Sequence, residues 1–258
     1  MPYRIIFFSA LFFLFSSSLI SQTKLNLNVY GGYTMPVADL KGDFPDTLGA
    51  TTYLDFDKST TLLTKSGFNI GAIGKYSVDT LGKARVTAGF NYNSFSGSKD
   101  YPKNGATLTY KNKVSIFTIS LGAEYGFFPK KKFNPFVGLD LAMNFFSGKI
   151  EASGDSTFSI QRKSESRFGI VVNGGVDIKL NKSIGAVVGV KYGLTNLIGK
   201  KTEITTTSTL QTDDEETGSS SFRELSLNDE ESSNNKSKTL YYIQFYAGVS
   251  FYFGEILK

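Results

Sequence analysis

Apolar and polar residues alternate one by one along eight segments of the chain. In the first segment Leu25, Leu27 and Val29 share one side, and Asn26 and Asn28 share the other. A period of two places unlike side chains on opposite faces of a β-strand. The pattern predicts strands at 25–34, 68–78, 85–93, 117–127, 137–145, 167–179, 184–195 and 241–253. Each segment has about the ten residues that a tilted strand needs to cross a membrane.

Short and long connections alternate between these segments. The short ones are 79–83, 129–133 and 181–183, and the long polar ones are 36–65, 98–111, 151–165 and 200–237. The short connections carry turn-forming residues, as hairpins require. This order predicts four up-and-down hairpins, with the short turns and both ends of the sheet at one end and the long loops at the other.

The N-terminal segment has the order of a secretory signal peptide. Arg4 precedes an apolar run over 5–20, and Ser21 offers the small residue that cleavage before Gln22 needs. We therefore expect a signal peptide at 1–21 and one β-barrel domain at 22–258. An uncleaved anchor is the alternative, but the run is short for a membrane span and no cluster of charges follows it.

The polar face of the predicted strands indicates which face points outward. It is rich in Gly, Asn, Ser and Thr, which suit a narrow interior, and it carries charges of both signs in mid-strand. The candidates for an internal ion-pair network are Lys75, Arg85, Glu124, Asp140, Asp177 and Lys191, with Arg167 and Lys179 on the same face. Such a network would fill the bore, so we expect no open diffusion pore. A soluble lipid-binding barrel, with the apolar face inward, is the alternative.

Aromatic residues near the segment ends favour the membrane barrel. They lie on the apolar face and suit the girdles that flank a membrane: Tyr33, Tyr76, Tyr92, Phe127, Phe145, Tyr192 and Phe253. After residue 21 the chain has no apolar run near the roughly 20 residues of a spanning helix. A membrane barrel meets the backbone's need for hydrogen bonds in hydrocarbon, because a closed sheet leaves no unpaired edge.

Composition excludes most catalysis. The 258 residues include no histidine and no cysteine, which removes imidazole bases, zinc ligands and disulfides. We expect no enzyme activity, no metal and no cofactor. A Ser–Lys pair with Lys191 as base, or a carboxylate pair among Glu124, Asp140 and Asp177, is conceivable, but structural ion pairs explain these residues better. The net charge of +5 forms no basic stripe, so we expect no nucleic-acid partner.

Two clusters of charge lie in the connections. The acidic runs 213–216 and 229–231 belong to the longest loop, which we interpret as flexible and solvated, although divalent cations could bridge it to lipopolysaccharide. Lys130, Lys131 and Lys132 occupy a short turn, where solvation is the simplest interpretation and an acidic partner or lipid headgroups are alternatives.

The closing segment 241–253 alternates strictly and ends on an aromatic residue, Phe253. With the signal peptide, the eight segments and the loop order, the chain resembles the small outer-membrane barrel proteins of Gram-negative bacteria, the OmpA/OmpX-like and PorT-like group. The resemblance implies an all-β, eight-stranded antiparallel up-and-down transmembrane barrel in the outer membrane. It also implies that the barrel-insertion machinery recognises the last strand, with Tyr241, Phe245, Phe251 and Phe253 as the assembly signal.

The expected function follows from this architecture. We expect a structural, surface-interaction or secretion/assembly accessory role carried by long extracellular loops. The alternative is binding or transport of a small hydrophobic ligand through the barrel. The expected partners are outer-membrane lipid and lipopolysaccharide, the insertion machinery, and an extracellular or secretion-system protein. The pattern leaves the specific partner, the oligomeric state and divalent-cation binding by 200–237 open.

Overall fold

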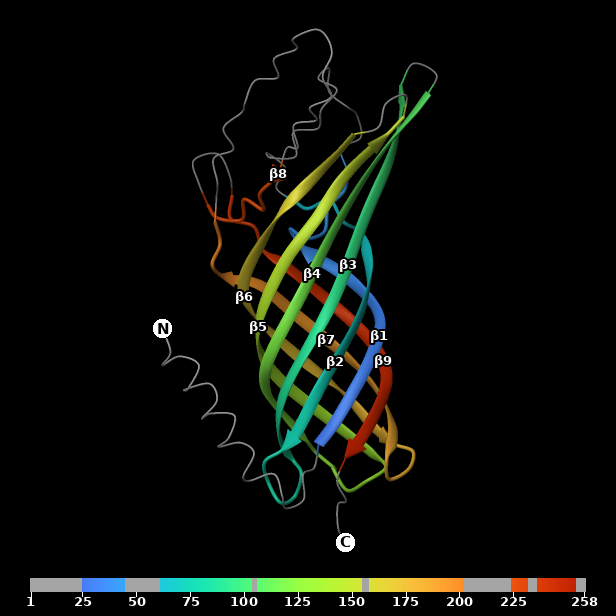
Figure 1. Cartoon of the computed structure of the whole chain (residues 1–258), viewed down its shortest axis with the longest axis vertical. Helices are drawn as coiled ribbons and strands as arrows, with labels where there is room; N and C mark the ends of the chain where they lie inside the picture. The colour runs from blue at the N-terminus through green and yellow to red at the C-terminus, as the bar shows by residue number, and fades with distance from the viewer. Residues whose placement is uncertain are drawn as a thin grey trace, which may run out of the picture.

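The computed structural model describes residues 25–44, 61–103, 106–154, 158–201, 224–231 and 236–253. Figure 1 shows tilted strands wound around one long axis. The strands are β1 (Leu25–Ala38), β2 (Ser66–Ser77), β3 (Ala84–Lys103), β4 (Ala106–Gly126), β5 (Phe133–Ser153), β6 (Phe158–Lys179), β7 (Ile184–Ile198), β8 (Glu224–Leu225) and β9 (Leu240–Phe253). In the described part of the chain, no helix has the length and apolarity to cross a membrane.

Eight strands close into a barrel. Consecutive strands from β1 to β7 pair antiparallel, and β9 pairs antiparallel with both β7 and β1. The closing seam runs from Leu25 opposite Phe253 to Ala38 opposite Leu240. The two-residue β8 lies outside the barrel order and pairs parallel with β6. The predicted eight-stranded antiparallel barrel is confirmed, while the signal peptide at 1–21 lies outside the described residues and stays a prediction.

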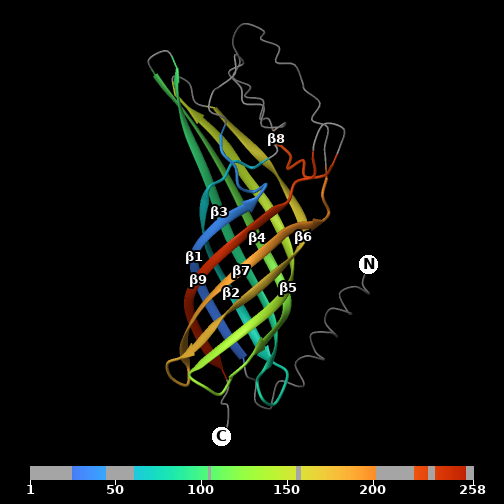
Figure 2. The same cartoon turned by 180° about the vertical axis from the view of Figure 1, so that it is seen from behind.

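Tight turns gather at one end of the barrel, where β1 also begins and β9 ends (Figures 1 and 2). Local hydrogen bonds explain these turns. Gly82 adopts a positive φ of 75°, and the carboxylate of Asp79 accepts a hydrogen bond from the backbone N–H of Ala84. In the β6–β7 turn the side chain of Asn181 accepts hydrogen bonds from two backbone N–H groups. Glycine and side-chain acceptors of this kind stabilise short connections.

The apolar face of the barrel points outward. Leu121, Val172 and Phe245 are 62%, 47% and 46% exposed, whereas Arg85 and Asp177 on the opposite face are 7% and 1% exposed. A water-soluble barrel would show the reverse. Aromatic side chains form a row near the end opposite the turns, which we call the upper aromatic row: Phe68, Tyr92, Phe117 and Phe145.

β3, β4, β5 and β6 continue farthest beyond the upper aromatic row, and there the two faces exchange polarity. We call these parts of β3–β6 the extension (Figure 1). Along β4 the inward side chains change from Glu124 and Thr118 to Ile116 and Val114, while the outward ones change from Phe117 to Ser115 and Lys113. Water now lies outside the sheet, so the apolar side chains turn inward.

The extension corrects the predicted loops. The stretches 98–111 and 151–165 are largely strand, because β3 reaches Lys103, β4 starts at Ala106, β5 reaches Ser153 and β6 starts at Phe158. The prediction failed because it recognised strands by an apolar outward face. In the extension the outward face is polar, so these residues were interpreted as loops. β1 likewise runs to Ala38, inside the predicted loop 36–65.

A matched pair of arginine substitutions tests which part of the wall faces lipid. Leu141 lies in mid-strand and is 70% exposed. The substitution Leu141→Arg should lower the free energy of unfolding by about 2–4 kcal/mol, because a charge near the bilayer midplane is poorly solvated. Ser147 lies two residues beyond Phe145 on the same face, and Ser147→Arg should change it by less than about 1 kcal/mol. Urea titration of the barrel in lipid vesicles measures both, and equal losses would contradict the outward-facing band.

Candidate functional site

The turn end of the bore is crossed by four buried charges, which we call the ionic layer: Lys75, Arg85, Glu124 and Asp177. The ammonium of Lys75 lies 3.1 Å from Glu124 Oε1 and 3.0 Å from Asp177 Oδ1. The guanidinium of Arg85 lies 2.5 Å from Glu124 and 2.7 Å from Asp177. Glu124 holds its partners by charge, since its oxygens accept no well-directed hydrogen bond from the described residues. The layer therefore joins β2, β3 and β4 to β6 across the bore.

The other two ion-pair candidates, Asp140 and Lys191, lie in the middle of the bore and have separate partners. Asp140 accepts hydrogen bonds from Thr87 (2.5 Å) and Asn173 (2.9 Å). The ammonium of Lys191 donates to the hydroxyl of Tyr30 at 2.5 Å and lies 4.3 Å from the centre of that ring. Among the described residues neither charge makes an ion pair, so these two are corrected as ion-pair candidates. The alternation of the sequence correctly placed both side chains on the inward face. It could not predict that the groups nearest to them in the bore would be neutral.

The other two charges predicted for the interior lie at opposite ends of the barrel. Lys179, half-buried, donates to the backbone carbonyl of Pro129 at the turn end. Arg167 lies at the far end and contacts Asp229. Neither joins the ionic layer.

Above the polar interior the bore is filled by an apolar core, which we call the plug. Its buried members are Leu40, Leu62, Phe95, Val114, Ile116, Phe146, Leu227, Leu240 and Tyr242. Leu227 comes from the connection between β7 and β9, and the others come from the wall and from the segments after β1 and before β2. The sequence prediction missed the plug, although the inward Phe95, Val114 and Phe146 continue the strand alternation and carried the signal.

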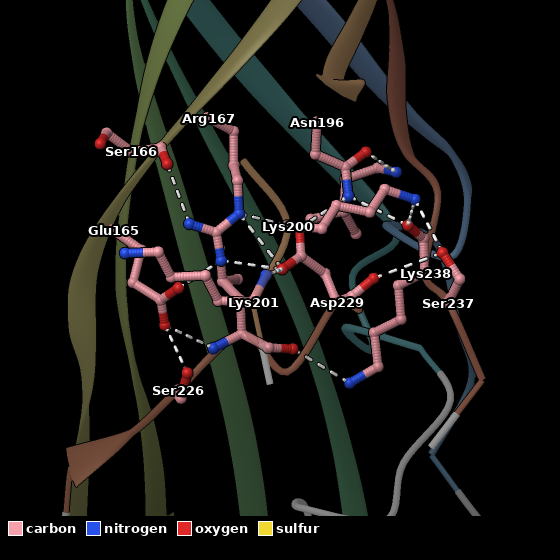
Figure 3. Close-up of polar contacts among 12 residues, drawn as sticks. Glu165, Ser166, Arg167, Asn196, Lys200, Lys201, Ser226, Asp229, Ser237 and Lys238 are labelled. Carbon is pink, nitrogen blue, oxygen red and sulfur yellow. Dashed lines mark hydrogen bonds and ion pairs between the residues drawn. The ribbon is translucent and has the colours of Figure 1, made fainter. Parts of the chain in front are cut away.

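A buried ion pair ties the β7–β9 connection to the wall (Figure 3). The guanidinium of Arg167 donates to both carboxylate oxygens of Asp229, at 2.8 Å and 3.0 Å. Asn196 and the backbone N–H of Lys201 also donate to Asp229, at 2.9 Å and 3.1 Å. Asp229 is fully buried. Burial alone would raise the pKa of this carboxyl, but the donors, led by Arg167, hold it below its usual range.

Glu165 anchors the same connection from a second side. Its carboxylate contacts Arg167 and accepts hydrogen bonds from the Ser226 hydroxyl (2.6 Å) and the Leu227 N–H (2.9 Å). Asn196 accepts from the N–H of Leu240 at 2.9 Å. We call Glu165, Arg167, Asn196 and Asp229 the closure network. It holds residues 226–229 in the mouth of the bore, with Leu227 inserted into the plug.

The closure network corrects the interpretation of the acidic loop. Asp229 was expected in a flexible solvated run, but it is buried because its charge is matched by Arg167. Glu230 and Glu231 are exposed, and the run 213–216 lies outside the described residues. Within the described ranges no three His, Cys, Asp or Glu side chains gather as metal ligands could.

The proposed assembly signal lies on the outward face of β9. Phe245, Phe251 and Phe253 are 46%, 36% and 50% exposed, and Tyr241 shares their face. β9 is the strand that completes the seam with β1. Recognition of these residues by an insertion machinery stays a prediction.

A family model of the outer membrane protein beta-barrel domain matches residues 19–199, which is more than half of the chain. The chain belongs to this family. Membership agrees with the closed antiparallel barrel and its outward apolar face, and it places this outer-membrane beta-barrel protein in the outer membrane.

Several solved structures resemble this outer-membrane beta-barrel protein at low sequence identity. Neisserial surface protein A is 14% identical over 89% of this chain and 97% of that chain, with a TM-score of 0.46. The outer membrane protein OprG from Pseudomonas aeruginosa is 12% identical over 91% and 98%, with a TM-score of 0.41. The attachment invasion locus protein of Yersinia pestis, solved with the heparin analogue sucrose octasulfate, is 11% identical over 88% and 99%, with a TM-score of 0.40. A comparison with curated proteins finds no significant match.

The ionic layer should be sensitive to loss of one carboxylate. Asp177→Asn leaves Lys75 and Arg85 buried with only Glu124 to balance them, and breaking a buried pair costs roughly 3–5 kcal/mol. Asp43, whose side chain is 79% exposed and pairs with Lys65, is the matched control, and Asp43→Asn should cost under about 1 kcal/mol. Urea midpoints followed by gel mobility report both, and a stability of Asp177→Asn equal to that of the control would refute the layer's role.

The low pKa of Asp229 predicts how acid affects the closure network. A carboxyl whose pKa is depressed in the folded state stabilises the fold at neutral pH and loses this effect only as the pH falls through its own lowered value. At about pH 3.5, just under the ordinary aspartate pKa of about 3.9, residues 226–229 should therefore still resist pepsin. They should become cleavable at lower pH, and in Asp229→Asn they should be cleaved throughout.

Glu231→Gln is the control for that experiment, because Glu231 is exposed and lies two residues after Asp229. Its peptide map by mass spectrometry should match the wild type at each pH. Identical cleavage of the wild type and Asp229→Asn at about pH 3.5 would show that the carboxylate does not hold the segment.

Proposed function

We propose that this protein is a sealed outer-membrane barrel that acts through its extracellular surface, in a structural, surface-interaction or secretion/assembly accessory role. The observation that carries the proposal is the filling of the bore at successive levels. The ionic layer crosses the turn end, hydrogen-bonded Asp140 and Lys191 occupy the middle, and the plug fills the far end.

Each level of this filling opposes passage for a different physical reason. A solute would have to separate buried opposite charges at the ionic layer, which leaves each charge poorly solvated. It would then have to displace packed apolar side chains in the plug, which exposes them to water. Eight strands enclose little space beyond that which side chains fill.

The extension supports the surface role. It carries β3–β6 beyond the upper aromatic row and presents serine, lysine and threonine side chains to the outside. Its inward face is occupied by a second apolar cluster that includes Phe44, Leu63, Tyr101 and Tyr110. A sheet that is packed on one face and polar on the other offers a rigid platform for a partner, which we propose to be an extracellular or secretion-system protein.

A hydrophobic ligand is the second candidate, and one observation favours it. An apolar groove of about 500 Å³ lies on the outer wall between β3, β4 and β5, lined by residues that include Val78, Val86, Ala123, Val137 and Leu139. The groove is open on the outer wall, and Arg85 and Glu124 are among the residues that line it. It therefore favours contact with an acyl chain in the bilayer over transport through the bore.

Two further proposals concern export. We propose that cleavage after Ser21 releases the mature chain, and that the outward aromatics of β9 are contacted by the barrel-insertion machinery. The exposed row of Phe245, Phe251 and Phe253 along the seam-closing strand supports the second proposal.

Reconstitution tests the sealed bore. Proteoliposomes that contain the folded wild type should not swell in small sugars, and planar bilayers should show no stepwise conductance, because solutes cannot cross the ionic layer and plug. An open porin reconstituted in parallel is the positive control. Steady unitary openings of the wild type would refute a sealed barrel.

The surface role needs a separate measurement in intact cells. A photo-crosslinking residue at exposed Ser98, on the outward face of the extension, should give a protein adduct. The same residue at Leu141, on the lipid-facing band, should give none, because it contacts lipid there. Adducts at neither position would remove support for a protein partner at this face.

A further inference from the structure

Three lysines share the outward face of β4 and β5 in the extension, and we call them the lysine cluster: Lys111, Lys113 and Lys149. Lys111 and Lys113 lie on β4, and Lys149 lies on β5. Their neighbours along the strands, Val114 and Ile150, are fully buried, so the lysines belong to the opposite, outer face. The cluster lies on the parts of β4 and β5 beyond the upper aromatic row.

The lysine cluster is poorly neutralised by the protein itself. Lys113 stands directly opposite Lys149 in the β4–β5 register, and like charges so placed repel. Glu151 pairs with Lys149 at 2.5 Å and faces Lys111. These three lysines and Glu151 together carry a net charge of +2. Asp100, a further carboxylate on the outer face, lies two residues along β3 from Ser98, the partner of Lys111, and accepts a hydrogen bond from Thr109. Among the described residues Lys111 and Lys113 make no ion pair, so an external anion would relieve the repulsion.

Glu151 reports the positive field on this face. The hydrogen bond from Lys149, together with the attraction of Lys149, Lys113 and Lys111, holds the pKa of the Glu151 carboxyl below its usual range. One carboxylate thus lies within the influence of all three lysines. An anion of similar size that approached this face would be attracted by the same three charges.

The height of the cluster selects a membrane ligand. Lys113 and Lys149 each lie four residues beyond the aromatic pair Phe117 and Phe145. A strand rises about 3.4 Å per residue and tilts by about 40°, so the backbones of these two lysines stand roughly 10 Å above the upper aromatic row, and that of Lys111, two residues farther, roughly 16 Å. Aromatic girdles mark the edge of the hydrocarbon, and long lysine side chains reach toward headgroups from this height.

We propose that the lysine cluster binds the phosphate groups of a phosphorylated lipid of the outer leaflet. Lysine ammonium groups bind phosphate as point charges, and two of them face each other across one strand pair, as a shared anion requires. The outward hydroxyl of Ser96 lies beside Lys113, where it can hydrogen-bond a phosphate oxygen, while the next hydroxyl on β4, that of Ser115, is bonded to the Tyr92 hydroxyl. This inference rests on the outer-membrane location and not on the sealed bore, so each can fail alone.

Native mass spectrometry of the folded full chain in detergent tests the site, with bisphosphorylated lipid A as the probe and the dephosphorylated form as its comparison. The wild type should prefer the bisphosphorylated form. Lys111→Gln, Lys113→Gln and Lys149→Gln should each weaken its binding roughly fivefold, because each removes about one lysine's share of the attraction to an anionic surface. The triple variant should lose the preference for phosphate.

A matched control removes the same charge at the opposite end. The triple variant Lys130→Gln, Lys131→Gln and Lys132→Gln alters the β4–β5 turn and should keep the preference. Glu151→Gln raises the cluster's net charge to +3 and should strengthen binding several-fold. Loss of preference in the turn variant, or its retention in the cluster variant, would overturn the assignment.

Two further experiments distinguish a loss of binding from a loss of folding, and a lipid ligand from a soluble one. Lys113→Gln relieves the repulsion from Lys149, so the barrel should keep its heat-dependent gel mobility without the probe while gaining less thermal stability from lipid A than the wild type gains. A soluble phosphorylated glucosamine disaccharide without acyl chains should bind much more weakly than lipid A, because it lacks anchoring beside the wall. Equal affinity would overturn the lipid assignment in favour of a soluble polyanion.

Discussion

The structure depends on one constraint, which is that hydrocarbon offers no hydrogen-bond partner to a peptide group. The β1–β9 seam meets that constraint because it leaves the wall without a free edge. Closure in turn encloses the polar face, and enclosed charges must balance. Among the described residues, the buried charges in the membrane-spanning part of the bore are three cations and three anions: Lys75, Arg85 and Lys191 with Glu124, Asp140 and Asp177. These six charges therefore balance, although only four of them meet in ion pairs.

The outer face of the same strands contacts lipid along one part of their length and water along the next. Within the membrane their outer face must be apolar and their inner face can be polar, whereas in the extension water lies outside and the inner face becomes apolar. The period of two continues through the transition along β3, β4 and β5, whereas the β5–β6 register shifts there at a β-bulge between Phe146 and Gly148. The upper aromatic row lies at the level where the two rules exchange. On the turn side of this row the bore is closed by paired charges and hydrogen-bonded polar groups. On the other side it is closed by apolar side chains that exclude water.

Local pattern was enough to predict the strand number, the antiparallel order, the turn end and the outward direction of residues such as Leu121. It was not enough to predict strand length, because β3–β6 continue beyond the point where their outward face stops being apolar, and that apolar face was the feature used to recognise them. Alternation gives the face of a side chain but not the partner at its level, which is why Lys191 meets Tyr30 instead of a carboxylate. Arg167 and Asp229 are 62 positions apart, so composition alone suggested a solvated acidic run.

The closure network links the seal of the bore to the strand that closes the wall. Its members come from β6, from β7 and from the segment just before β9, and Asn196 is bonded to Leu240 at the very start of that last strand. Asn196 donates to Asp229 and accepts from Leu240, so one side chain holds both the segment that seals the mouth and the strand that closes the wall. Loss of the seal and loosening of the closing strand at this end are therefore linked through a single residue.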